Sequence, residues 1–229
     1  MFRIGRSVEA LFRKPPELPS IEGDAFVFGS APNPVVPEKL LSRATVVTAN
    51  ASQLYLERFG FEKPDITFMR STMHWGESTD HLKQEQLRGR STGLLVLPSK
   101  KTDPNCTGQL EMLDRIGYRF DDLKIVDRAD CYWINNRVLN PKSRYLMEHF
   151  APSMGLRATI FCRFMGARNV YISGISLRRD GYSFSNIDHK RLHVDDDLKV
   201  FRRINSLELP VWATDQELAE DSDLECWQP

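Results

Sequence analysis

The sequence predicts a single α/β domain built on a mostly parallel sheet flanked by helices. First, short apolar runs alternate with helix-like segments along most of the chain. Second, these runs are rich in Val, Ile, Leu and Phe without polar alternation, as in parallel strands buried on both faces. Third, 229 residues suffice for one substantial domain.

The apolar runs and the segments between them give the predicted elements in order. The predicted strands are Ala25–Phe28, Thr45–Thr48, Ile66–Met69, Leu94–Leu97, Val170–Ile172 and Pro210–Trp212. The predicted helices are Glu38–Arg43, Ser52–Phe59, Glu77–Arg88, Gln109–Ile116, Ser153–Met165 and Val194–Leu207. Because such folds bind ligands outside the carboxyl ends of their strands, we expect function in the loops that follow the strands.

The predicted Rossmann-like domain spans residues 21–216, and three segments depart from it. Residues 1–20 form a basic amphipathic segment, suited to an anionic membrane surface or to packing on the domain. Residues 102–150 have no clear apolar period, so we expect an irregular insertion or lid with recognition residues, or a structural loop. Residues 217–229 are expected to form an acidic tail.

Charge and cysteine content exclude several classes of function. Lys plus Arg and Asp plus Glu both number 31, and this zero net charge argues against a general nucleic-acid binder. The four cysteines form no CxxC pair, which argues against a zinc site or a disulfide framework and favours a reducing compartment. No signal peptide or membrane span is evident. We therefore expect a cytoplasmic protein, with peripheral contact to the inner face of the cell membrane as a further option.

The first predicted strand ends abruptly in a loop of small residues, Gly29, Ser30, Ala31 and Pro32. Small residues let a phosphate or a nucleotide approach the backbone closely. The alternative is a tight turn between a strand and a helix.

The second predicted strand delivers Asn50 to the same edge of the sheet. An Asn side chain offers both a donor and an acceptor, which suits the edge of a base or a ribose hydroxyl. It also suits a cap for the helix that starts near Ser52, so both roles stay open.

The stretch "PSMGLRATIFCRFMGARNVYISGISL" joins a helix start to a second small-residue strand exit. Ser153, Met154 and Gly155 form the first turn, where the positive end of the helix dipole can hold a phosphate or a carboxylate. The helix leads into the next strand, which ends at Ser173 and Gly174.

The stretch "HVDDDLKVF" places His193 directly before an amphipathic helix. Imidazole readily exchanges a proton near neutral pH, although a lone histidine also occurs as a packing or capping residue. Asp195, Asp196 and Asp197 fill the first turn of this helix, where three carboxylates suit either a metal ion or the positive helix end.

Taken in order, these pieces resemble the small bacterial sialyltransferases that act on lipooligosaccharide, which are Rossmann-like and use CMP-sialic acid without a metal. "FGSAPNP" keeps Gly29 and Pro32 of the family's first loop, and Asn50 takes the place of an Asn that contacts the nucleotide. "PSMGL" and "YISGIS" occur at the family's separation. His193 with Asp197 in "HVDDDLKVF" matches the family's catalytic histidine and the helix that follows it.

The match extends in order over most of residues 24–214, with departures at several positions. Ser176 stands where the family has Asp. Arg178 replaces the first of two phosphate-binding tyrosines, and Tyr182 matches the second after a small gap. Arg70 stands where the family has an Asn at the third strand exit. A guanidinium at either position can still hold a phosphate.

The resemblance implies a glycosyltransferase that moves a sugar from a CMP-activated donor to a glycan acceptor with inversion. His193 would be the general base, and Arg178 and Tyr182 would stabilise the departing phosphate. No metal or other cofactor is expected, and the implied partners are the donor, the acceptor and conceivably a second copy of the chain, but no nucleic acid. The expected donor-binding residues are Gly29, Ser30, Ala31, Pro32, Asn50, Arg70, Ser153, Met154, Gly155, Ser173 and Gly174.

Two alternatives stay open. A pyrophosphokinase-like nucleotide enzyme would need Mg²⁺, with the carboxylates of Asp195–Asp197 as ligands. A non-catalytic relative would bind a glycan or a nucleotide without turnover, which the departures at Ser176 and Arg178 suggest. Metal dependence separates the first alternative from the leading hypothesis, and turnover separates the second.

Overall fold

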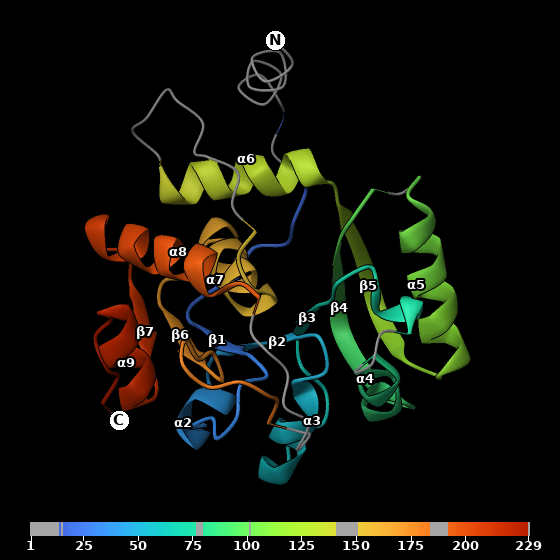
Figure 1. Ribbon diagram of the computed structural model, residues 1–229, viewed down its shortest axis with the longest axis horizontal. Helices are drawn as coiled ribbons and strands as arrows, with labels where there is room; N and C mark the ends of the chain where they lie inside the picture. Colours follow the sequence, from blue (N-terminus) through green and yellow to red (C-terminus); the bar gives the residue numbers. More distant parts are fainter. Residues whose placement is uncertain are drawn as a thin grey trace.

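The chain folds as the single α/β domain that the sequence predicts (Figure 1). The computed structural model describes residue 14 and residues 16–76, 80–100, 102–140, 151–183 and 192–228. Most of the amphipathic segment expected at residues 1–20 therefore lies outside the described residues.

One sheet organises the molecule. Within the described residues, seven parallel strands pair in the order β5-β4-β3-β2-β1-β6-β7. The central strands are buried along their whole length, which explains their continuous apolar sequences. The strands are β1 (Ala25–Phe28), β2 (Thr45–Ala49), β3 (Ile66–Phe68), β4 (Ser91–Pro98), β5 (Arg119–Val126), β6 (Val170–Ser173) and β7 (Val211–Ala213).

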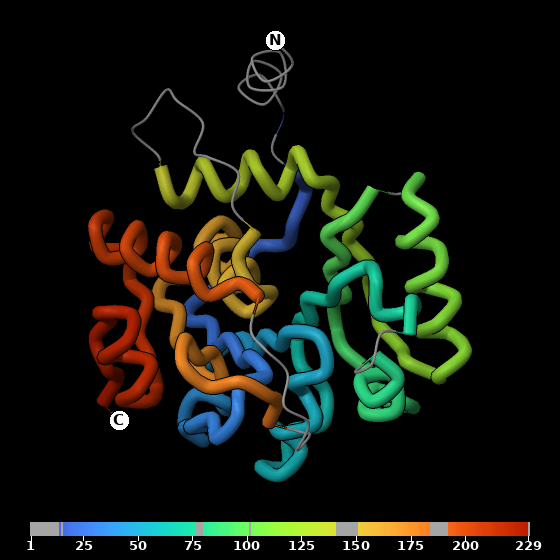
Figure 2. Tube along the Cα trace, in the orientation of Figure 1, coloured from blue at the N-terminus to red at the C-terminus, as the bar shows by residue number. Residues whose placement is uncertain are grey.

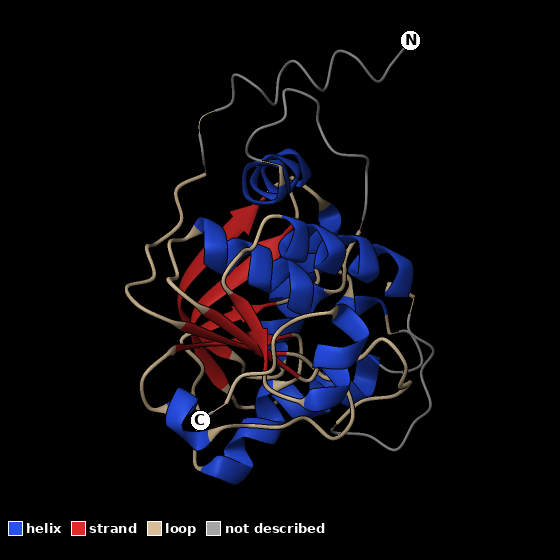
Figure 3. Cartoon of the chain, turned by 90° about the vertical axis from the view of Figure 1, so that its left-hand side faces the viewer, coloured by secondary structure: helices blue, strands red, loops and turns tan. Residues whose placement is uncertain are grey.

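Helices cover both faces of the sheet, as the view turned by 90° shows (Figure 3). The described helices are α2 (Glu38–Leu41), α3 (Gln53–Leu56), α4 (Asp80–Leu87), α5 (Pro104–Arg115), α6 (Arg128–Leu139), α7 (Met154–Phe164), α8 (Val194–Ser206) and α9 (Gln216–Ser222). Two short 3₁₀ turns, η1 (Glu57–Phe59) and η2 (Met73–Trp75), follow α3 and β3.

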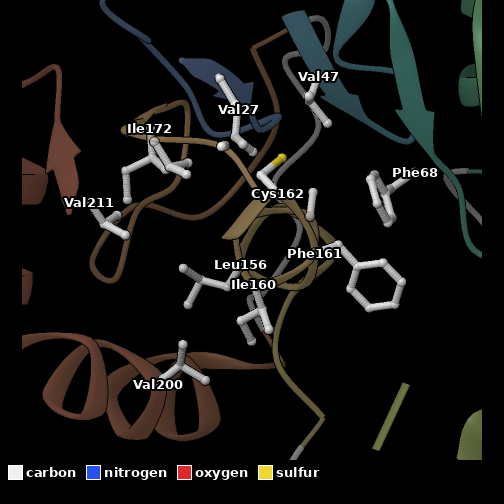
Figure 4. Packing of buried hydrophobic residues seen from close by; sticks show 14 of the residues in the cluster. Val27, Val47, Phe68, Leu156, Ile160, Phe161, Cys162, Ile172, Val200 and Val211 are labelled. Carbon is white, nitrogen blue, oxygen red and sulfur yellow. The ribbon is translucent and has the colours of Figure 1, made fainter. Parts of the chain in front are cut away.

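Helix α7 is the centre of the larger core. On one side it packs against Val27, Val47 and Ile172 of the sheet, and on the other it meets Val200 of α8 (Figure 4). Phe161 extends sideways to Phe68 in an edge-to-face contact with ring centroids 5.1 Å apart. Because α7 is enclosed by the sheet, α6 and α8, its position is fixed, and so is the loop at its start.

The segment expected to be irregular, residues 102–150, is regular in its described part. Residues 104–139 form α5, β5 and α6, and β5 pairs with β4 along its whole length. The sequence pattern concealed this strand because β5 is a partly exposed edge strand, and Asp121 and Asp122 interrupt its apolar residues. The prediction of an irregular insertion is therefore corrected for residues 102–140, and residues 141–150 lie outside the described residues.

The segment expected to be an acidic tail, residues 217–229, is also structured. Leu218 and Ala219 of α9 are buried in the main core, and Trp227 packs edge-on against Tyr171 of β6. Acidic residues on the exposed side of α9 produced the tail-like composition. The folded domain therefore extends beyond residue 216.

The carboxyl ends of β1 and β6 are in unusually close contact. Strands β2 to β5 extend the sheet on one side of β1, whereas β6 lies on the other, so this pair marks the topological switch point of the sheet. A Cβ on Gly29 would overlap the carbonyl oxygen of Gly174, and a Cβ on Gly174 would overlap that of Gly29. The Ala31 N–H also donates to the Gly174 carbonyl at 2.7 Å. Glycine at both positions is therefore a packing requirement.

All four cysteines are unpaired in the structure, in agreement with the sequence prediction. No helix among the described residues is both long enough and apolar enough to cross a membrane.

Replacing Gly29 with alanine should destabilise the fold. The added methyl group would collide with the backbone of Gly174, and backbone atoms cannot move aside as a flexible side chain can. We expect Gly29→Ala to lower the free energy of unfolding by about 1–3 kcal/mol, measured by urea denaturation.

Gly155→Ala is the matched control for this prediction. Its Cβ would come closest to the flexible Ile175 side chain, at 3.0 and 3.1 Å, and would lie at an ordinary 3.9 Å from the Gly29 Cα; alanine is also the better helix former. We expect its free energy of unfolding to stay within about 1 kcal/mol of wild type. Equal stabilities of wild type and Gly29→Ala would contradict the packing role of Gly29.

Candidate functional site

A cavity of about 300 Å³ lies at the switch point, within the range typical of small-molecule sites. The loops that follow β1, β2, β3 and β6 contribute to its wall, together with the first turns of α7 and α8. Figure 2 shows that these two helix starts, far apart in the sequence, lie side by side. The cavity is where an open parallel sheet binds its ligands.

Most of the predicted site residues line this cavity, including residues that were inferred from separate stretches of the sequence. The structure brings together Gly29, Ser30, Asn50, Arg70, Ser153, Met154, Gly155, Gly174, Tyr182 and His193.

Four predicted site residues lie elsewhere. Ser173 is buried and donates its hydroxyl to the Val35 carbonyl at 2.6 Å. Ala31 is buried in the loop, and Pro32 lines a separate cavity of about 210 Å³. Arg178 forms an ion pair with Asp221 of α9 and does not line the main cavity. Arg178 therefore lies outside the cavity where the sequence analysis placed it, and its role on the departing phosphate stays a prediction.

Asn50 is held in a conformation that directs its amide group. Its backbone has φ of 54°, and its side-chain oxygen accepts the N–H of Arg70 at 3.0 Å. The helix that follows has Ser52 as its N-cap residue, so the capping role considered for Asn50 is wrong. Because the Asn50 oxygen is engaged and its NH₂ has no partner in the described part of the chain, it presents donors to a ligand.

The start of α7 provides a positive wall. Ser153 is the N-cap residue, and Gly155 in the first turn is buried beside the cavity. This helix has 11 residues, enough for its dipole to favour an anion at the N-terminal end.

Two carboxylates of α8 fix the segment that enters α7. The Ala151 N–H donates to Asp196 Oδ2 at 2.8 Å, and the Ser153 N–H donates to Asp197 Oδ1 at 2.7 Å. The first of these bonds holds the pKa of Asp196 below its usual range, with a smaller contribution from Lys199 against the opposing effect of burial. Asp196 and Asp197 thus have a structural role at the helix start. Among the described residues, no group of three or more His, Cys, Asp or Glu side chains is placed to hold a metal ion.

His193 stands at the mouth of the cavity with a defined tautomer. Its Nδ1 lies 2.8 Å from the Ala151 carbonyl oxygen, and because a carbonyl can only accept, Nδ1 carries the hydrogen. In the neutral form of the ring, Nε2 then has the lone pair, so it is the nitrogen that could accept a proton from a bound molecule. His193 precedes α8 but makes no side-chain capping bond, which excludes a capping role.

Sequence reasoning missed several cavity residues, among them Lys83 and Arg157. Lys83 of α4 is nearly buried, pairs with Asp80 at 3.2 Å and lies 5.1 Å from the centre of the Tyr182 ring. Arg70 pairs with the same carboxylate. Asp80 and Lys83 are three residues apart on α4, so the sequence could have indicated this pair. Only tertiary packing brings the pair to Arg70 and Tyr182. For Arg157, the four-residue spacing from Ser153 could have indicated a shared helix face.

Asp197→Ala should loosen the start of α7. Removing a buried charged acceptor leaves the Ser153 N–H without its partner, which should lower the free energy of unfolding by about 1–3 kcal/mol. Urea denaturation measures the change. Asp197→Asn keeps an oxygen acceptor for the Ser153 N–H and should therefore lose less of the free energy of unfolding than Asp197→Ala.

The matched control is Asp195→Ala, which removes an exposed carboxylate from the same helical turn. Only its interaction with the helix dipole is lost, so the expected change is below about 1 kcal/mol. If Asp197→Ala is no more destabilising than Asp195→Ala, the bond to Ser153 does not hold this segment.

Comparison with known proteins gives a likeness of structure and none of sequence. No family model matches the chain, and no curated protein sequence matches it either. Among solved structures, the sialyltransferase CstII of Campylobacter jejuni in complex with cytidine-5′-monophosphate superposes with a TM-score of 0.55 at 15% identity, covering 90% of this chain and 86% of that one.

Two further solved structures agree. CST-II in complex with a trisaccharide acceptor and CMP has a TM-score of 0.53 at 14% identity, and the match covers 90% of this chain and 86% of that chain. The monofunctional α-2,3-sialyltransferase Cst-I of Campylobacter jejuni has a TM-score of 0.53 at 11% identity, and the match covers 93% of this chain and 84% of that chain. At such low identity the likeness establishes the fold, and this chain has the fold of the sialyltransferases CstII and Cst-I.

Proposed function

We propose that this protein is a sialyltransferase-like glycosyltransferase that transfers a sugar from a CMP-activated donor to a glycan acceptor. The observation that carries the proposal is the position of His193, which lines a cavity that also contains a helix N-terminus and whose Nδ1 is bonded to the Ala151 carbonyl. This leaves Nε2 as the ring nitrogen that would accept a proton. The fold supports it, because solved structures with the same fold contain CMP, a CMP-sugar analogue, or CMP with a trisaccharide acceptor.

The donor would bind along the strand exits. The backbone at Gly29 and Ser30 forms one wall, and the NH₂ group of Asn50 donates to the cytidine or its ribose. The phosphate would lie near Ser153 and Gly155, where the dipole of α7 favours negative charge. That arrangement stabilises the phosphate as it leaves the sugar.

The acceptor would approach from the side of His193. As the acceptor hydroxyl attacks the anomeric carbon, the bond from that carbon to the phosphate oxygen breaks, and CMP leaves with the bonding electrons. His193 Nε2 takes the hydroxyl proton, while the Ala151 carbonyl holds the Nδ1–H and thereby keeps the ring in place. Direct attack of this kind inverts the anomeric configuration.

The first test is the binding of CMP by calorimetry in the presence of EDTA. We expect binding without added metal, and a rise in the thermal unfolding midpoint with CMP concentration. Asn50→Asp should weaken binding about tenfold or more, because it keeps an acceptor for the Arg70 N–H, removes the donors and adds a negative charge that repels CMP. Binding that appears only with Mg²⁺ would favour the metal-dependent alternative, and no binding at all would reject the proposal.

The second test is His193→Ala. If His193 is the base, turnover should fall by roughly 10²- to 10⁴-fold while CMP affinity changes little. Steady-state kinetics with a CMP-sugar and a glycan acceptor measure this change. His81→Ala removes an exposed histidine from α4 and serves as the control. Wild-type turnover in a folded His193→Ala protein would exclude the proposed mechanism, and a wild-type chain that binds CMP without turnover would favour a non-catalytic relative.

A further inference from the structure

Arg157 is a cation of the cavity wall with an unusual lack of partners. It lies on α7, one turn after Ser153, and is half-buried. In the described part of the chain, its Nε is buried without a hydrogen-bond partner, and its guanidinium forms no ion pair with a carboxylate. Leaving a buried charged donor unsatisfied is costly, so a ligand that accepts a hydrogen bond from this Nε inside the cavity would remove that cost.

In the described part of the chain, the carboxylates near the cavity have other partners and form no ion pair with Arg157. Arg70 and Lys83 share the carboxylate of Asp80. The carboxylate of Asp197, which also lines the cavity, accepts the Ser153 N–H.

Another arginine of the same helix shows what a structural role looks like. In the described part of the chain, the Nε of Arg163 is also buried without a hydrogen-bond partner, but its Nη1 donates to the backbone carbonyls of Ala167 and Arg168, which closes the end of α7. Arg157 has no comparable contact with the backbone.

The group behind Arg157 is neutral. The guanidinium interacts with the Cys131 thiol of α6, but burial raises the pKa of that thiol to about 11 in spite of the nearby positive charge. The thiol therefore stays protonated at neutral pH, and the charge of Arg157 remains available to the cavity.

We infer that Arg157 holds an oxyanion of the bound donor. A planar guanidinium can donate through Nε and one Nη to two oxygens of the same phosphate or carboxylate, and such a pair would satisfy the buried Nε. The identity of the ligand rests on the proposed function. The oxyanion is either the phosphate of the nucleotide or a carboxylate on the transferred sugar.

Calorimetry on Arg157→Gln, with four ligands, tests the inference. The ligands are cytidine, CMP, CMP-3FNeuAc, whose sugar carries a carboxylate, and inorganic pyrophosphate. Arg202→Gln is the control, because it removes an exposed positive charge from α8, outside the cavity. Thermal unfolding confirms that each variant is folded, and Arg157→Lys, which keeps the charge without the planar fork, should recover only part of the affinity.

The pattern of affinities identifies the oxyanion. If it is the phosphate, Arg157→Gln should weaken CMP binding roughly 10- to 100-fold and leave cytidine unchanged. If it is the sugar carboxylate, only CMP-3FNeuAc should lose affinity. Unchanged affinity for all of the anionic ligands, or equal losses in Arg202→Gln, would overturn the inference.

Pyrophosphate separates this inference from the proposed function. If wild type binds no cytidine ligand but binds pyrophosphate in a manner that needs Arg157, the proposed function fails and the oxyanion site stands. If wild type binds none of the four ligands, both are rejected.

Discussion

The contact between the backbones of Gly29 and Gly174 is the constraint on which the site depends. It brings the exits of β1 and β6 closer than any side chain would allow, and both loops then turn away from the same point. The floor of the cavity at this point is therefore backbone. Gly155 allows a similar close approach at the start of α7. Because it has no side chain, the first turn of the helix can pack against Ile175.

The second constraint joins the starts of α7 and α8. Asp196, Asp197 and His193 each contact the backbone of residues 151–153 through a different atom. These bonds fix the imidazole relative to the end of α7 that favours an anion. The proposed transfer would require this constant separation, because the base must meet the acceptor hydroxyl while the phosphate is held at the helix end.

The sequence indicated the sheet and much of the site because parallel strands end at one edge. Gly29, Asn50 and the turn at Ser153 could be placed together once the strands were located. The edge strand β5 escaped notice because an exposed strand lacks a continuous apolar run. Arg178 was misplaced for a different reason: the hydroxyl of Ser176 accepts its N–H, and the side chain reaches α9, which the sequence did not reveal as a helix. The sequence also could not show that Arg157 lines the cavity without an ion-pair partner among the described residues, because its neighbours are set by tertiary packing.

The pairing of β1 with β6 also bears on how the protein acquires its activity as it folds. Ala25 pairs with Val170, so the chain must close a long loop before the two strands meet, whereas β1 and β2 pair locally. During synthesis the first five strands leave the ribosome before the floor of the cavity can exist. A ligand consequently cannot assist the early steps of folding. It can only capture the chain once this non-local pairing has formed, so the gain of binding competence depends on the closing of this loop.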